Sequence, residues 1–165
     1  MVSKARTPSY FLLTGADQHR TLAAFSSAYE TCRARLESKI WSLRASTPCR
    51  AEMKAGDHLV IYASGKRKFG QHFVGVAQIA DAPQALRSQA RDLPKQIAIA
   101  SDMTVVDYLL SLKKVSIFAP PKPIGEIKDR LSIVKNPSSP KWGCYLQAGC
   151  RRITERDFLL ILNSA

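Results

Sequence analysis

The apolar positions of this chain fall into runs of two different periods, and each run predicts an element of secondary structure. Residues 10–14 form a short apolar run that is typical of a buried strand. Beyond it, apolar side chains recur at steps of three and four, the spacing of one face of a helix. They are Leu22, Phe25, Tyr29, Cys32, Leu36 and Ile40. We therefore expect a helix that is capped by Asp17 and ends within residues 38–43, where Trp41 lies.

An alternating pattern further along the chain predicts a β-hairpin. A turn at residues 54–57 leads into a strand at 58–63, and residues 72–80 form the partner strand. Gly75 lies inside the partner strand and indicates a bulge or the close approach of another backbone. The loop between the two strands carries three consecutive basic residues at its tip, which are Lys66, Arg67 and Lys68.

The remaining segments complete the predicted fold. Residues 81–93 permit a helix, and residues 108–118 form a long strand. The prolines of 119–123 should end this strand, because proline has no N–H to donate. A short helical turn within 124–133 follows, and Thr154 is the expected N-cap of an apolar C-terminal helix. Strands outnumber crossover helices, so the predicted class is α+β, a small, mostly antiparallel β-barrel with flanking helices.

The length and composition are those of one soluble globular domain. The chain has 165 residues, of which 45% are apolar and 23% are charged. We expect a single domain over residues 10–165, preceded by a flexible basic segment at residues 1–9. No apolar run approaches the roughly 20 residues of a membrane span, and no signal peptide is recognisable at the start. We therefore expect a cytoplasmic protein with no membrane partner.

The excess of basic residues indicates a polyanionic partner. There are 25 Lys and Arg against 13 Asp and Glu, a formal net charge of +12 at pH 7. A field of this sign attracts nucleic acid first, then anionic membrane surfaces and acidic proteins. On charge alone, a basic surface that is merely solvated is the alternative.

The residue constellations of enzymes and metal sites are absent from the sequence. There is no Gly-rich phosphate loop, no G-x-S-x-G, no H-E-x-x-H and no zinc-deaminase signature. The four cysteines show no C-x-x-C spacing, so we expect no metal and no cofactor. His58 is expected to be a surface strand residue and not a general base. The sequence therefore favours a binding protein over a catalyst.

Four segments of the chain, taken in order, carry a resemblance to a known family. They are "KIWSLRAST", "MKAGDHLVIYAS", "HFVGVAQIA" and "SSPKWGCYLQAGCRRITERDFLLIL". Together they resemble the EVE domain of the PUA-like superfamily, and the same order is similar to that of the YTH domains. The likeness covers residues 10–162 and implies a PUA-like barrel with flanking helices.

The resemblance implies a non-catalytic reader that turns a modified base out of its stack into an aromatic pocket. In the YTH relatives the base is methylated adenine in RNA. In EVE domains, often associated with restriction and modification systems, the expected ligands are modified cytosines in DNA, such as 5-methylcytosine. Trp41 matches the tryptophan that walls the pocket, and Ser42 matches the adjacent residue whose backbone meets the base. Residues 147–150 match a rim that approaches base and phosphate.

The aromatic side chain that faces Trp41 across the base is left open. The YTH pocket takes a second tryptophan from the segment after the phenylalanine-x-glycine strand, but residues 81–106 contain no aromatic side chain. The candidates for this second wall are Tyr62, Tyr108, Trp142 and Tyr145. The expected polar contacts to the base edge are the backbone amides of Ser42 and Leu43 and the side chain of Gln147.

Basic residues near these positions are the expected phosphate contacts. They are Arg44, Arg50, Lys66, Arg67, Lys68, Lys141, Arg151 and Arg152. Two alternatives stay open: a PUA-like RNA-binding protein, and a small amidohydrolase-type enzyme that acts on modified nucleosides. Some PUA-like relatives use a catalytic lysine, for which Lys39 or Lys141 would be the candidates here. The sequence indicates neither an oligomeric state nor a partner protein.

Overall fold

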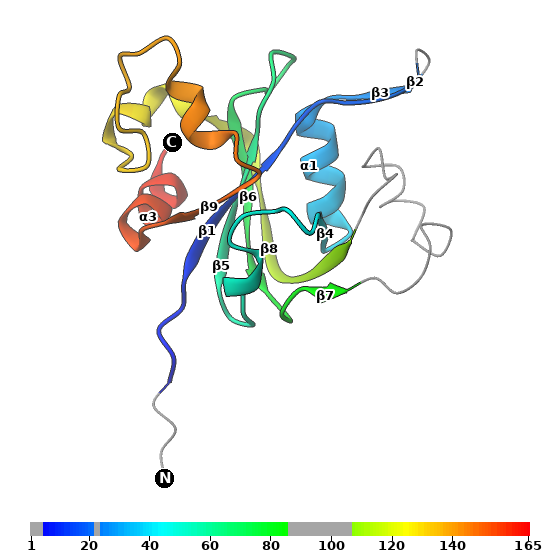
Figure 1. The fold of residues 1–165 in the computed structure, drawn as a ribbon. Helices are drawn as coiled ribbons and strands as arrows, with labels where there is room; N and C mark the ends of the chain where they lie inside the picture. The colour runs from blue at the N-terminus through cyan, green and yellow to red at the C-terminus, as the bar shows by residue number, and fades with distance from the viewer. Residues whose placement is uncertain (1–4, 22–23, 86–106) are drawn as a thin grey trace.

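The computed structural model describes residues 5–21, 24–85 and 107–165, and these residues form a curled mixed sheet with two α-helices (Figure 1). The strands of the sheet follow one another in the order β4-β8-β6-β5-β1-β9, and β7 also pairs with β8. The β1–β5 pair is parallel and the other pairs are antiparallel. The bounds of the strands are β1 Tyr10–Gly15, β2 Gln18–Thr21, β3 Ala24–Ser26, β4 Ile40–Leu43, β5 His58–Ala63, β6 His72–Ile79, β7 Gln84–Ala85, β8 Tyr108–Pro123 and β9 Cys150–Ile153. The predicted α+β class with a mostly antiparallel sheet is confirmed, and the sheet is curled as a half-barrel.

Both faces of the sheet are covered, because successive residues of a strand point to opposite sides. On one side Leu13 packs with Cys32 and Leu36 of α1 (Ala28–Glu37), in what we call the α1 core. On the other side Leu12 packs with Phe158 of α3 (Glu155–Asn163), in what we call the α3 core. Figure 1 shows α1 and α3 on opposite sides of the sheet. Short 3-10 helices complete the fold at Arg50–Glu52 (η1), Ile124–Glu126 (η3), Lys128–Arg130 (η4) and Trp142–Leu146 (η5).

Helix α1 begins later than the apolar spacing predicts, because the β2–β3 hairpin occupies the first half of the predicted helix. Ser27 is the N-cap. Its side chain accepts from the Glu30 N–H, and the Glu30 carboxylate accepts from the Ser27 N–H, which is a complete capping box. The prediction that Asp17 is the N-cap is therefore wrong. Asp17 still accepts a hydrogen bond from the first-turn N–H of Ala28 at 2.7 Å.

Trp41 lies on strand β4. The prediction that it lies at the end of a helix is therefore wrong. The helix ends at Glu37, and Lys39 follows with a positive φ of 56°, a conformation that cannot continue a helix. The Lys39 carbonyl then accepts from the Leu112 N–H at 2.9 Å, and β4 pairs with β8 so that Trp41 stands opposite Leu110. Pairing with a distant strand, which no local pattern encodes, ends the helix here.

Strand β8 continues through the proline-rich segment that was predicted to end it. Pro123 stands opposite His72, and Lys122 stands opposite Phe73 of β6. The β4 and β7 partners of β8 reach only from Tyr108 to Ser111, so the second half of β8 pairs on one side alone in the described chain. Proline is tolerated there, because an edge position requires no N–H on its open side.

The predicted hairpin is confirmed as β5 and β6, and Gly75 shows the close approach that the sequence indicates. The β6–β8 register shifts between Phe73 and Gly75. A Cβ atom added to Gly75 would lie 2.5 Å from the Ser116 carbonyl oxygen of β8. The predicted C-terminal helix is confirmed as α3, with the Thr154 side chain accepting from the Asp157 N–H at 3.1 Å.

The segment before β1 is tied to the sheet from Arg6 onward. The Asp57 carboxylate, which is fully buried, accepts from the Arg6 guanidinium and from the backbone N–H groups of Ser9 and Lys54 (2.9 Å each). These contacts hold Arg6 and Ser9, within the predicted basic N-terminal segment, against the turn before β5. Most of the segment 81–93, for which a helix was predicted, lies outside the described residues. Within its described part, Gln84–Ala85 form strand β7. No helix among the described residues has the length and hydrophobicity needed to cross a membrane.

Candidate nucleic-acid interface

The end of β1 gathers segments that are distant in the sequence. The Gly15 carbonyl accepts from both the backbone N–H and the hydroxyl of Ser64 (2.9 Å each), which joins the basic β5–β6 hairpin to this end. The Thr14 N–H donates to the Gly149 carbonyl (3.0 Å), and its hydroxyl donates to the Leu146 carbonyl (2.6 Å). The basic hairpin loop and the predicted rim therefore meet at one end of β1.

Trp41 approaches the same end of β1 from inside the half-barrel. A Cβ atom added to Gly15 would lie 3.6 Å from Cη2 of the Trp41 indole and 2.3 Å from the Cys32 Sγ. Only glycine fits there without displacing the core. The Trp41 side chain is 2% exposed and belongs to the α1 core. The predicted wall and the predicted rim are thus neighbours across β1, with the indole buried.

An arginine of α1 covers the Trp41 indole. The Cζ atom of Arg35 lies 4.8 Å from the ring centroid. Burial lowers the pKa of Arg35 from its ordinary value, because the charged guanidinium has lost water. A desolvated cation over an indole face is an attractive contact. In this conformation the indole face under Arg35 is closed to a base.

The sheet divides the candidates for the second aromatic wall. Tyr62, Trp142 and Tyr145 belong to the α3 core or pack against it, on the far side from Trp41. Tyr108 packs against the α1 core, and the guanidinium of Arg50 lies 3.8 Å from the centroid of its ring. A pocket that includes Trp41 must therefore take its second wall from the α1 side. Of the four candidates, Tyr108 alone meets this condition.

Trp142 takes part in a separate hollow at the same end of the sheet. Trp142 lies in η5, and Lys141, Gln147 and Gln71 line a cavity of about 430 Å³ with it. The ammonium of Lys128 lies 5.2 Å from the centroid of the Trp142 ring. The structure thus brings three of the predicted site residues together here, but on the α3 side of the sheet. On β4, Ser42 is half-buried and Leu43 is buried in the α1 core.

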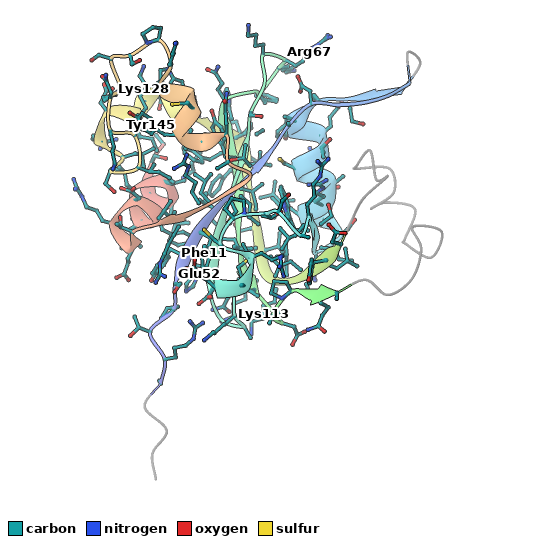
Figure 2. The ribbon with its side chains drawn as sticks, in the orientation of Figure 1. Phe11, Glu52, Arg67, Lys113, Lys128 and Tyr145 are labelled. Atoms are coloured by element: carbon teal, nitrogen blue, oxygen red, sulfur yellow. The ribbon has the colours of Figure 1, made fainter. Side chains whose placement is uncertain are left out.

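The predicted phosphate contacts do not form one patch. Lys66, Arg67 and Lys68 are exposed on the β5–β6 loop. Figure 2 shows Arg67 at the tip of this hairpin, far from Glu52. Glu52 is the ion-pair partner of Arg152 at 3.2 Å, so Arg152 lies at the other end of β5 from the loop. Of the rest, Arg44 and Lys141 are exposed, whereas Arg50 and Arg151 are half-buried.

The two buried thiols of the α1 core are shifted away from their reactive form, and His58 packs on an aromatic ring. Burial raises the pKa of the Cys32 thiol to about 12 and also raises that of Cys150. A nucleophilic cysteine needs the opposite shift, because the thiolate is the reactive form. His58 is half-buried, and its ring stacks on Tyr10 with centroids 5.1 Å apart and planes at 13°. It is therefore part of an aromatic cluster and less exposed than the sequence predicts.

Comparison with protein families identifies the chain. The model of the EVE domain matches residues 26–164, and the chain belongs to the EVE domain family. The family suggested by the sequence motifs, within the PUA-like superfamily, is thereby confirmed. A search of the curated proteins found no match to this chain.

Several solved structures share the fold. Human THYN1 in complex with DNA containing 5-methylcytosine has a TM-score of 0.57 at 13% identity, covering 93% of this chain and 95% of that one. The N-terminal domain of McrB from Staphylothermus marinus has a TM-score of 0.62 at 11% identity, covering 96% and 95%. The MmI1 YTH domain has a TM-score of 0.50 at 13% identity, covering 93% and 91%. At these identities the likeness concerns the fold.

Two residues of this site were not found from the sequence. Arg35 lies between apolar positions of an amphipathic helix, where a charge is usually solvated, so no signal marked it as a neighbour of Trp41. Thr14 lies in an apolar run and was assigned to the buried strand. A polar residue near the end of an otherwise apolar run was the only sign in the sequence that a side-chain hydrogen bond forms there.

Removing Arg35 should uncover Trp41. We expect Arg35→Ala, in a chain that also carries Trp142→Phe, to raise the quenching of tryptophan fluorescence by acrylamide. The lost contact should lower the free energy of unfolding by about 1–2 kcal/mol, the range of a desolvated cation–π contact. Arg33→Ala is the matched control, because Arg33 is exposed on the same helix and pairs with Glu37. Equal quenching in both variants would show that Arg35 does not cover the indole.

Proposed function

We propose that this EVE domain is a non-catalytic module that binds nucleic acid and reads a modified base. The preferred ligand is a modified cytosine in DNA, which is turned out of its stack onto Trp41. One observation carries the proposal: Trp41, the Leu146–Gly149 backbone and the basic hairpin loop converge at the end of β1. A human protein of the same fold was crystallised with DNA containing 5-methylcytosine, which supports the ligand class.

The chemistry of such a pocket requires Arg35 to move. An indole stacked on a base contributes about 1–3 kcal/mol, with little preference among bases. The base must therefore replace the Arg35 guanidinium on one face of Trp41, and the freed cation would then lie beside the nucleic acid. This exchange keeps the indole covered in both states and avoids exposing the α1 core in the absence of a ligand.

Selection of one base requires polar groups at its edge and close packing around its modification. The backbone of Ser42 and Leu43 is the proposed edge contact. The Gln147 side chain is left out, because it lines the hollow on the α3 side. A methyl group contributes only about 0.8 kcal/mol by burial, so a strong preference needs a tight second wall. Tyr108 is the proposed aromatic partner on the α1 side, held by Arg50.

The phosphate contacts are proposed for the end of β1, where Lys66, Arg67, Lys68 and Lys141 surround the site, and for Arg44 beyond β4. Arg151 and Arg152 are left out of this set, because they lie along β9 and Arg152 pairs with Glu52 near the opposite end of β5. These contacts supply affinity that is independent of sequence and falls with salt.

The salt dependence of binding tests the placement of the phosphate contacts. Replacing Lys66 and Lys68 by glutamine should lower the affinity for a short oligonucleotide at low salt. The slope of log K against log salt should fall by about 2, close to one unit for each lost phosphate contact. The control replaces Lys113 and Lys114, which are exposed on β8, by glutamine. A similar loss in the control would place the nucleic acid elsewhere.

A binding panel tests the proposed function itself. Oligonucleotides that differ only in one cytosine or adenine modification, in both DNA and RNA, should show tightest binding to a modified cytosine in DNA. Tightest binding of methylated adenine in RNA would assign the site to the alternative RNA-binding function. Hydrolysis of acetylated or methylated cytidines by the protein would refute the non-catalytic function.

A further inference from the structure

A large groove runs along β9 and reaches the rim residue Ala148, beside the end of β1. Its volume is about 1000 Å³, and five consecutive residues line it, from Cys150 to Thr154. Side chains of a strand point alternately to the two faces, so an unbroken run can line one groove only if the strand's own edge borders it. Its lining also includes Pro48 and Cys49, Ser132 and Ile133, and Cys144, Tyr145 and Ala148.

The backbone of β9 offers unused hydrogen-bonding groups to this groove. Strand β9 is the last of the sheet and pairs with β1 alone among the described residues. The bond from the Thr14 N–H to the Gly149 carbonyl sets the alternation of the antiparallel pair. By that alternation, the N–H and C=O groups of Cys150 and Arg152 point away from β1. No hydrogen bond between described residues uses them.

The side chains of the groove are basic. Lys135, Arg151 and Arg152 line it, and the buried Nε of Arg151 has no hydrogen-bond partner among the described residues. The side chains of Arg152 and Glu52 are both more than half exposed, so Arg152 can leave Glu52 for another carboxylate at little cost in free energy. Asp157 also lines the groove, but its two carboxylate oxygens already accept from Ser132 and Ile133.

From these observations we propose that the groove binds an extended acidic segment of a partner protein, which adds to the sheet as a strand beside β9. A free strand edge is complementary to a peptide backbone and not to a polynucleotide, which has no ladder of N–H and C=O groups. A second copy of this chain is disfavoured, because pairing β9 with β9 would bring the arginines of both copies together. Glutamate or aspartate side chains at alternate positions would face Arg151 on one side or Arg152 on the other.

The test measures the binding of a fluorescein-labelled peptide of alternating glutamate and valine to the full chain. Fluorescence anisotropy of the peptide reports binding. We expect this peptide to bind and its lysine–valine counterpart not to bind. The same peptide with alternate backbone nitrogens methylated should lose binding, because it cannot donate to β9, and this comparison requires no change in the protein. The proposal would be overturned if the acidic and basic peptides bound equally, or if the methylated acidic peptide bound as tightly as the unmethylated one.

Protein variants then locate the contact. Arg152→Pro removes the outward N–H and should abolish binding, whereas Arg152→Ala also loses the pair with Glu52 but keeps the N–H and should bind. Arg151→Glu should weaken binding by at least about tenfold, the effect of one charge-assisted hydrogen bond. Displacement of the peptide by unmodified oligothymidylate would contradict the proposal and assign the groove to nucleic acid. The modified-base site is tested separately, with oligonucleotides and Trp41 variants and without this peptide, so failure here leaves the proposed function standing.

Discussion

Replacing Trp41 by leucine is expected to leave a folded protein that binds nucleic acid but has lost most of its preference for a modified base. Leucine keeps apolar volume in the α1 core, where Trp41 is 2% exposed, but offers no π-face. The lost stacking should cost about 1–3 kcal/mol of binding, which is roughly fivefold to more than a hundredfold in affinity. Affinities for a modified oligonucleotide and its unmodified counterpart measure the effect.

The alanine variant of the same residue separates the two roles of the indole. Because Trp41 is buried, Trp41→Ala should lower the free energy of unfolding by about 3–5 kcal/mol, which chemical denaturation measures. The control is Trp142→Phe, on the other side of the sheet, which should retain the preference. If Trp41→Leu discriminates modified from unmodified DNA as well as the unchanged protein does, Trp41 is a core residue only.

Replacing Asp57 should be among the most destabilising changes in the chain. Asp57→Ala removes the acceptor of two backbone N–H groups, those of Ser9 and Lys54, and leaves Arg6 without its partner. We expect a loss of about 3–5 kcal/mol in the free energy of unfolding, because two backbone N–H groups and a guanidinium lose a fully buried acceptor. Denaturant midpoints of the two proteins provide the measurement.

Two further substitutions show which part of this cost is due to the backbone bonds. Arg6→Ala should cost less than Asp57→Ala, because Arg6 is 42% exposed and the carboxylate keeps both N–H donors. The loss in the free energy of unfolding for Asp57→Asn should lie between those two values, because the amide oxygen of asparagine can still accept a hydrogen bond. A loss below about 1 kcal/mol in Asp57→Ala, the value of an ordinary exposed pair, would contradict the assigned role.

The elements that the sequence predicts correctly are those whose pattern is local. β1 is a short apolar run, β5 and β6 follow an alternating pattern bounded by turns, and α3 has an N-cap before an apolar stretch. Helix α1 was misjudged at its start because apolar residues of the β2–β3 hairpin happen to follow a helical spacing. The Ser27–Glu30 capping box was the local signal that could have corrected this.

The failures concern pairings between distant segments. Nothing near Trp41 shows that it belongs to a strand, because its partner on β8, Leu110, lies far along the chain. The prolines of β8 are tolerated only because one edge of the strand is open there. For the candidate site, the resemblance points to Trp41 and the rim, and this assignment stays a prediction. Which aromatic shares a face with Trp41 depends on the side of the sheet, and this requires the three-dimensional register.

The most direct test of the central claim is the fluorescence of Trp41 itself, in a chain carrying Trp142→Phe, during titration with duplex DNA. One duplex contains a single 5-methylcytosine and the other contains cytosine at the same position. If the modified base stacks on Trp41, the modified duplex should quench the emission strongly and at lower concentration than its counterpart. Binding of both duplexes, seen by anisotropy, with the same unchanged Trp41 emission would contradict the claim.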